Sequence, residues 1–144
     1  MGNVSEHFSN RDFICKCGAC GGQVRIHLGL VGALEAIAEH FRKIPRIAEA
    51  YRCEIVAEKT NLPKKNAHRM GKAAHISIEG VSLPELFKFA EEVPEIRGLG
   101  YYVKENVVHI DTRQMDVPGT KDKWIKDGTK IIPLTDEVRP KFGL

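Results

Sequence analysis

Apolar side chains in the first third of the chain recur at the spacing of one helical face. The positions that carry this pattern are Leu28, Val31, Leu34, Ile37 and Phe41. Steps of three and four residues predict an amphipathic helix over 28–42, and Pro45 ends it because proline cannot continue a helix. Residues 1–27 show no such period and are predicted to form an irregular, cysteine-rich N-terminal segment.

After this predicted helix the apolar residues no longer recur at helical spacing. Residues 46–52 predict a short strand. Residues 53–72 are mostly polar and contain Pro63, so they are predicted to form a long loop. A loop of that length in a compact domain is usually functional or mobile.

From Ala74 the period changes to two, which is typical of a half-buried strand. Alternate residues from Ala74 to Ile78 should face the core, and His75 should then point to the opposite side. Ser82 followed by Glu85 resembles a helix N-terminal capping box and predicts a second helix. Its apolar stripe is formed by Leu83, Leu86, Phe87 and Ala90.

Two further apolar runs, 98–103 and 107–111, predict a β-hairpin. In its second strand the apolar residues Val108 and Ile110 should face the core. His109 therefore lies on the opposite face, the face on which the preceding strand is expected to carry its own histidine.

The tail over 114–144 contains Pro118, Pro133 and Pro140 and is predicted to be irregular. Strands and helices do not alternate strictly along the chain, which favours an α+β fold rather than an α/β fold. We expect an antiparallel sheet with helices packed on it, in a single domain that spans residues 1–144. No internal repeat or low-complexity segment divides the chain.

Composition narrows the class of protein. The 144 residues carry 22 Lys and Arg against 19 Asp and Glu, a formal net charge of +3, with no basic stripe. This argues against a nucleic-acid partner. No apolar run is long enough to span a membrane. We expect the protein to be a monomer. The N-terminus MGNVSEHFSN lacks the features of a signal peptide, so localisation stays unknown; a phage or prophage lysis protein would suit such a chain.

The cysteines are unevenly distributed: Cys15, Cys17 and Cys20 fall within six positions, and Cys53 stands apart. Neighbours as close as Cys15 and Cys17 are awkward disulfide partners, whereas thiolates at C-x-C-x2-C spacing can surround a metal ion. Cys53 could complete a four-thiolate zinc site. The alternatives are one disulfide with two free thiols, or four reduced thiols.

Three of the six histidines are candidate metal ligands. His68 and His75 bound the stretch HRMGKAAH, and His109 lies in the predicted hairpin. If the strands that carry His75 and His109 are neighbours, both imidazoles reach one face of the sheet, and His68 could approach from the side. Three protein ligands are typical of catalytic zinc. The alternative is that each is an ordinary hydrogen-bonded histidine.

The order of four motifs strengthens the zinc hypothesis: SEHFSNRDFICKCGAC, AYRC, NAHRMGKAAHISIEG and GLGYYVKENVVHIDTR. Together they resemble the zinc D-alanyl-D-alanine carboxypeptidase and murein endopeptidase family, the LAS metallopeptidases, whose fold relatives include the hedgehog signalling domain. The resemblance covers residues 5–113 and is closest to small bacterial and phage-type cell-wall peptidases. It implies a zinc peptidase that acts on peptidoglycan stem peptides or cross-links, as a carboxypeptidase or an endopeptidase.

The resemblance also assigns roles to residues. His68 matches the first zinc ligand and His109 the third, while Arg52 matches an arginine that can engage a substrate carbonyl or carboxylate. The family's aspartate ligand is His75 here, and its S-G before Y-R is Glu49-Ala50. Imidazole can replace carboxylate as a ligand, but the swap equally suits a degenerate domain that binds zinc or cell-wall peptides without hydrolysis.

On the enzyme hypothesis, Asp111 is the nearest carboxylate on the strand face of His109. It could act as the general base or could orient a ligand histidine. Glu105 is expected to point away. Tyr101 and Tyr102 are expected to pack in the hairpin, and Trp124 to anchor the tail.

Overall fold

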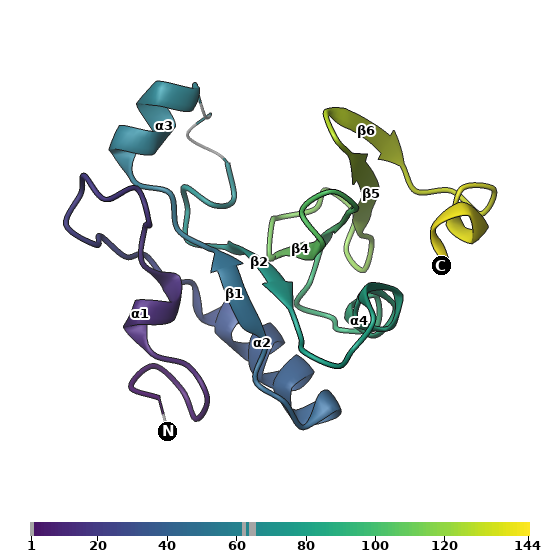
Figure 1. Cartoon of the computed structure of the whole chain (residues 1–144), viewed down its shortest axis with the longest axis horizontal. Helices are drawn as coiled ribbons and strands as arrows, with labels where there is room; N and C mark the ends of the chain where they lie inside the picture. Colours follow the sequence, from purple (N-terminus) through teal and green to yellow (C-terminus); the bar gives the residue numbers. More distant parts are fainter. Residues whose placement is uncertain (1, 62, 64–65) are drawn as a thin grey trace.

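A computed structural model describes residues 2–61, 63 and 66–144 of the chain. It contains one six-stranded sheet with the strand order β1-β2-β4-β3-β5-β6 (Figure 1). The strands are β1 (Arg46–Glu49), β2 (Ala73–Ser77), β3 (Gly98–Tyr102), β4 (Val107–Asp111), β5 (Asp122–Asp127) and β6 (Lys130–Pro133). The helices are α1 (Asn10–Phe13), α2 (Leu28–Phe41), α3 (Glu54–Thr60), α4 (Leu83–Ala90) and a final 3-10 turn, η1 (Arg139–Phe142).

The predicted α+β class is confirmed, with one difference in the sheet. Every neighbouring pair of strands is antiparallel except β3 and β5, which run parallel, so the sheet is mixed. The parallel pairing arises because the chain leaves β4 and returns beside β3 through residues 112–121. No helix in the described part of the chain is long and apolar enough to cross a membrane.

The core lies on one face of this sheet. Helices α2 and α4 cover it with an apolar cluster that includes Leu34, Ile37 and Phe87 and the inward residues of the strands. The predicted alternation of β2 is confirmed, since Ala74 and Ile76 are fully buried in that cluster. Ser82 begins α4, and its side chain accepts a hydrogen bond from the backbone N–H of Glu85.

The opposite face of the sheet carries a row of aligned residues, which we call the site row. Glu49 in β1 pairs with His75 in β2, which pairs with His109 in β4. His109 pairs with Gly100 in β3, and Gly100 pairs with Trp124 in β5. The site row therefore crosses five neighbouring strands.

The predicted irregular tail over 114–144 is wrong, because β5, β6 and η1 fall within it. In the segment DKWIKDGTKIIP, Asp127 pairs with Lys130, so the hairpin turns at Gly128-Thr129, where Gly128 supplies the positive φ of 67° that a two-residue turn requires. Pro133 is compatible with this arrangement because it ends β6 at the edge of the sheet, where a missing backbone N–H costs little.

The predicted loop over 53–72 is also wrong in part, because it contains helix α3. Residues 62 and 64–65 of that predicted loop lie outside the described residues, as does residue 1 of the N-terminal segment. Only Ala57 of α3 is buried, so the helix lacks the apolar stripe by which a sequence pattern is recognised. The predicted strand over 46–52 ends earlier, at Glu49, after an irregularity in its pairing with β2.

Candidate metal centre

Three histidines from separate parts of the chain meet on the site row. His75 and His109 come from neighbouring strands and are directly paired in register. His68 lies in the turn that precedes β2, where Asn66 Oδ1 accepts hydrogen bonds from the backbone N–H groups of His68 and Arg69. This turn brings His68 beside the two strand histidines. The convergence expected from the sequence is therefore present.

The three imidazoles offer nitrogen atoms to a common point. His75 Nε2 lies 3.1 Å from His68 Nε2 and 3.1 Å from His109 Nδ1. A tetrahedral zinc ion with Zn–N bonds of about 2.0–2.1 Å separates its nitrogen ligands by about 3.3 Å. The side chains are buried, with 3%, 8% and 5% exposure for His68, His75 and His109. The arrangement has the dimensions of a zinc site.

The nitrogen on the far side of each ring faces an oxygen acceptor. His68 Nδ1 donates to the backbone carbonyl of Ala50 at 2.7 Å, and His109 Nε2 donates to Asp111 at 2.7 Å. His75 Nδ1 lies 3.5 Å from Glu49 Oε2. Such partners keep the proton on the outer nitrogen and leave the inner lone pair free, as in histidines that bind metals.

The electrostatic environment keeps the rings of His68 and His75 neutral. Burial, with the neighbouring His109, lowers the pKa of His68 to about 3, and burial together with His68 and His109 lowers the pKa of His75 to about 2. Both are therefore deprotonated at neutral pH, the state in which imidazole binds a metal.

We predict that the zinc-free protein loses stability as the pH falls from about 6.5 towards 3. In this window the unfolded chain protonates both histidines, whose unfolded pKa is about 6.5, while the folded protein does not. The unfolded state then binds more protons, so the free energy of unfolding falls by up to about 1.4 kcal/mol per pH unit for each histidine. Urea unfolding of chelator-treated protein at a series of pH values measures this.

The matched comparison for that pH series is the His68→Gln, His75→Gln double variant. It retains the titrations of all carboxylates, so its pH profile should be distinctly flatter above pH 4. Identical profiles for the two proteins would contradict the prediction.

Asp111 lies behind His109 and has no exposed surface. Besides His109, its carboxylate accepts hydrogen bonds from Arg113: from Nε at 2.9 Å, Nη2 at 2.7 Å and the backbone N–H at 3.1 Å. Burial alone would raise the pKa of Asp111, but the hydrogen bonds from His109 and Arg113 lower it below its usual value. Of the two roles expected for Asp111, this geometry favours orienting a histidine over accepting a proton.

A cleft of about 400 Å³ opens above the histidines. Tyr102 stacks on His109 with 5.8 Å between ring centroids, and Trp124 lies 5.2 Å from the same ring. Trp124 was expected to anchor the tail, but it lies in the cleft because β5 joins the sheet beside β3. Tyr101, in contrast, packs in the core against Phe87, as expected for a hairpin residue.

Apart from Asn66, the remaining cleft residues are charged. Arg52 lines the wall, where its Nε donates to Glu49 at 2.5 Å. Lys126 pairs with Glu105 at 2.9 Å. Glu105 was expected to point away, but it lines the cleft. With Arg113, the cleft therefore presents three cationic side chains beside the three histidines.

Two glycines of β3 allow these side chains to lie close to the sheet. A Cβ atom on Gly100 would approach Trp124 Nε1 to 2.7 Å and the Tyr102 ring to 2.6 Å. A Cβ on Gly98 would overlap the Asp111 carboxylate. The G-L-G spacing could have indicated this crowding, because alternate glycines leave one face of a strand bare. The roles of Gly98, Gly100 and Arg113 were missed from the sequence.

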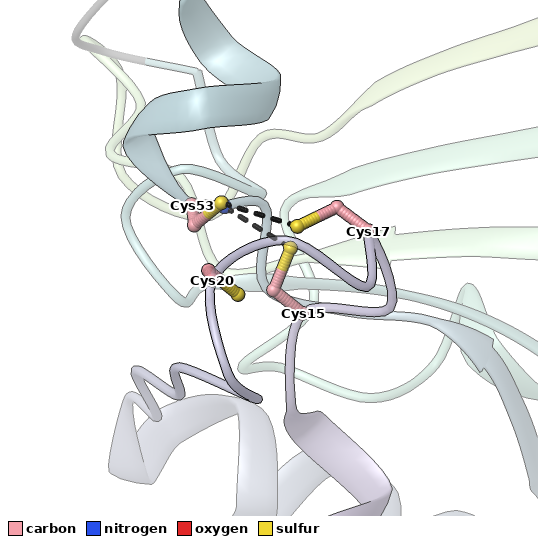
Figure 2. A group of neighbouring side chains, drawn as sticks. All are labelled: Cys15, Cys17, Cys20 and Cys53. Carbon is pink, nitrogen blue, oxygen red and sulfur yellow. Dashed lines mark hydrogen bonds between the residues drawn. The ribbon is translucent and has the colours of Figure 1, made fainter.

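The four cysteines form a second cluster, which does not line the cleft. Cys15 and Cys53 are buried, Cys17 and Cys20 are half-buried, and none is in a disulfide. Figure 2 shows the loop after α1 bringing three of them against Cys53 at the start of α3. The N-terminal segment therefore lies beside the stretch of chain that carries Arg52 and Cys53.

Comparison with known proteins identifies the family. A sequence model of the family described as Peptidase M15 matches residues 6–111. The peptidoglycan L,D-endopeptidase MepK of Escherichia coli strain K12 is 36% identical over 76 residues, which cover 49% of this chain and 41% of MepK. MepK of Shigella flexneri matches to the same extent. The match therefore spans less than half the length of these curated relatives. No solved structure gives a significant match. The chain belongs to the peptidase M15 family.

Proposed function

We propose that this chain is a zinc-dependent peptidase that hydrolyses peptide bonds in peptidoglycan, with zinc held by His68, His75 and His109. The observation that carries the proposal is the set of three buried imidazoles whose outer nitrogens all face oxygen acceptors. When bound, zinc supplies Lewis-acid activation of water and of the scissile carbonyl. Three protein ligands match the number found in catalytic zinc sites.

The cationic side chains of the cleft suit a substrate that carries carboxylates. Peptidoglycan stem peptides contain several such groups. Among the described residues, the terminal nitrogens of Arg52 have no hydrogen-bond acceptor, since its Nε alone bonds Glu49. Arg52 can therefore hold a substrate carboxylate or the oxygen of the scissile carbonyl through two parallel N–H donors. Lys126 and Arg113 provide further positive charges in the cleft.

Three residues keep the histidines in place while the substrate binds. Asp111 fixes the ring of His109, the carbonyl of Ala50 fixes His68, and Glu49 faces His75. Asp111 is thus a positioning residue. The aromatic faces of Tyr102 and Trp124 keep water away from one side of the centre and offer an apolar wall to the peptide.

The likeness to MepK, which is named an L,D-endopeptidase, favours an endopeptidase over a carboxypeptidase. Digestion of purified peptidoglycan by the zinc-loaded protein, with products identified by mass spectrometry, tests this. We expect cross-linked muropeptides to be converted into monomeric ones. Release of only free D-alanine would instead indicate a carboxypeptidase.

A second candidate function is binding of cell-wall peptides without hydrolysis. One observation favours it: each carboxylate around the cleft is already paired, Glu49 with Arg52, Glu105 with Lys126 and Asp111 with Arg113. A general base must accept a proton, and a carboxylate held by a cation is a weaker base. Peptide binding measured by calorimetry, with no products after prolonged digestion, would select this function over the peptidase.

A further inference from the structure

The cysteine cluster joins two segments that are far apart in sequence. Cys15, Cys17 and Cys20 lie in the loop after α1, and Cys53 is the residue that precedes α3. Figure 2 shows the four sulfur atoms directed towards one another. All four lie within 4.8 Å of one another, so each can contribute one ligand to a single ion.

The spacing of the sulfur atoms fits a metal and not a disulfide. Cys17 Sγ and Cys53 Sγ are 3.7 Å apart. A disulfide requires about 2.05 Å. Zinc with Zn–S bonds of about 2.3 Å separates its sulfur ligands by about 3.8 Å in a tetrahedron. The observed separation is close to the length of that tetrahedral edge.

The backbone around the cluster donates hydrogen bonds to the sulfur atoms. Ala19 N–H donates to Cys17 Sγ, Gln23 N–H donates to Cys20 Sγ and Cys53 N–H donates to Cys15 Sγ, each at 3.4 Å. Donors aimed at sulfur stabilise the thiolate over the thiol. Gly18, with a φ of 77°, allows the loop to turn back sharply between Cys17 and Cys20 for this arrangement.

We infer that Cys15, Cys17, Cys20 and Cys53 bind one structural zinc ion, separate from the three-histidine centre. Four thiolates complete a closed tetrahedral site with no position left for substrate or water, which is the character of structural zinc. The inference does not depend on the proposed peptidase activity.

The position of the cluster shows what this zinc would hold together. β1 is the edge strand of the sheet, and the N-terminal segment runs along it. Lys16 Nζ donates to the carbonyls of Ile47 and Ala48 at 3.0 and 3.1 Å, and Tyr51 N–H donates to Phe13 O. The zinc fastens this segment to the chain immediately after Arg52.

Through that connection the cysteine site supports the cleft. Residues 50–53 run directly from the Ala50 carbonyl, which holds His68, to Cys53. Arg52 is the neighbour of Cys53 and lines the cleft. A fixed Cys53 therefore limits how far both the His68 acceptor and the Arg52 side chain can move.

Metal analysis of the full chain, purified with reductant and without added metal, tests the inference. We expect Cys17→Ser to contain one zinc equivalent fewer than wild type, and His68→Ala to retain the cysteine-bound zinc. Cys17→His should restore the lost equivalent, because three thiolates and one imidazole also form a structural zinc site. Unchanged zinc in Cys17→Ser, or a metal other than zinc on the cysteines, would overturn the inference.

A second pair of measurements needs no cysteine variant, in case Cys17→Ser does not fold. Titration with a mercurial reagent should release one zinc equivalent as four thiols react. Substitution with cobalt(II) should give a thiolate charge-transfer band that persists in His68→Ala. Reaction of the thiols without zinc release, or a mass showing disulfides in the reduced preparation, would contradict the site. Absence of peptidase activity in wild-type protein that holds the cysteine-bound zinc would instead count against the proposed function and leave this inference intact.

Discussion

We expect His75→Ala to abolish the proposed hydrolysis of peptidoglycan and to remove the zinc proposed at the three histidines, while leaving the zinc proposed at the cysteine cluster in place. The variant leaves two imidazoles, and His75 is the one whose Nε2 lies 3.1 Å from a nitrogen of each partner. Lewis-acid activation contributes several kcal/mol to the stabilisation of a transition state, so we expect a fall in kcat/KM of at least about 10³-fold. Product release from purified muropeptides and zinc content per chain are the two measurements.

His40→Ala is the matched control for that variant. His40 lies in α2, where it stacks on Phe89 at 3.8 Å between ring centroids and does not line the cleft. It should keep wild-type zinc content and activity. Full activity in His75→Ala would rule out the proposed centre.

His75→Asp separates the peptidase from the non-hydrolytic alternative. If the wild type is an active peptidase, a carboxylate at this position should preserve zinc and measurable activity, because carboxylate oxygen is also a zinc ligand. If the wild type only binds peptides because imidazole occupies this position, the same variant should gain hydrolysis.

The second large effect is expected at Asp111, where we predict that Asp111→Ala lowers the free energy of unfolding by about 2–3 kcal/mol. The substitution leaves Arg113 without its buried partner, a loss at the low end of the usual range because the Arg113 side chain keeps 35% exposure. For a chain of this size that corresponds to a fall in Tm of roughly 5–12 °C. Thermal unfolding measures it.

The same variant should weaken zinc binding at the histidines by about 10–100-fold, since Asp111 holds the outer nitrogen of His109. A merely structural role for Asp111 would leave zinc affinity unchanged, so competition with a chelator distinguishes the two. Asp122→Ala is the control: Asp122 also pairs with Arg113, but it is largely exposed and does not contact His109. Equal effects of the two substitutions would contradict the positioning role.

The sequence predicted the central part of the site because strict alternation leaves little freedom in a strand. Once Ala74 and Ile76 face the core, His75 must face away, and the same holds for His109 between Val108 and Ile110. Adjacent strands then bring both rings to one face. The hairpin 98–111 and helix α2 follow from equally regular patterns.

The parts that were missed depend on contacts that no local pattern reveals. Helix α3 is mostly exposed, so its residues show no apolar period. Trp124 enters the cleft only because β5 adds to β3 in parallel, a pairing between segments separated by β4. The role of Arg113 depends on its side chain folding back onto Asp111, two residues earlier.

The site row also bears on how the protein matures. Shifting β4 by one residue against β2 would exchange His109 for an apolar neighbour, because strand side chains alternate between faces. Three imidazoles therefore meet only when β2 and β4 have paired in the native register. Binding of a metal by the three histidines would therefore favour the native register of β2 and β4, and its binding free energy would oppose a shift of that register. Supply of zinc during synthesis would accordingly raise the yield of native chains.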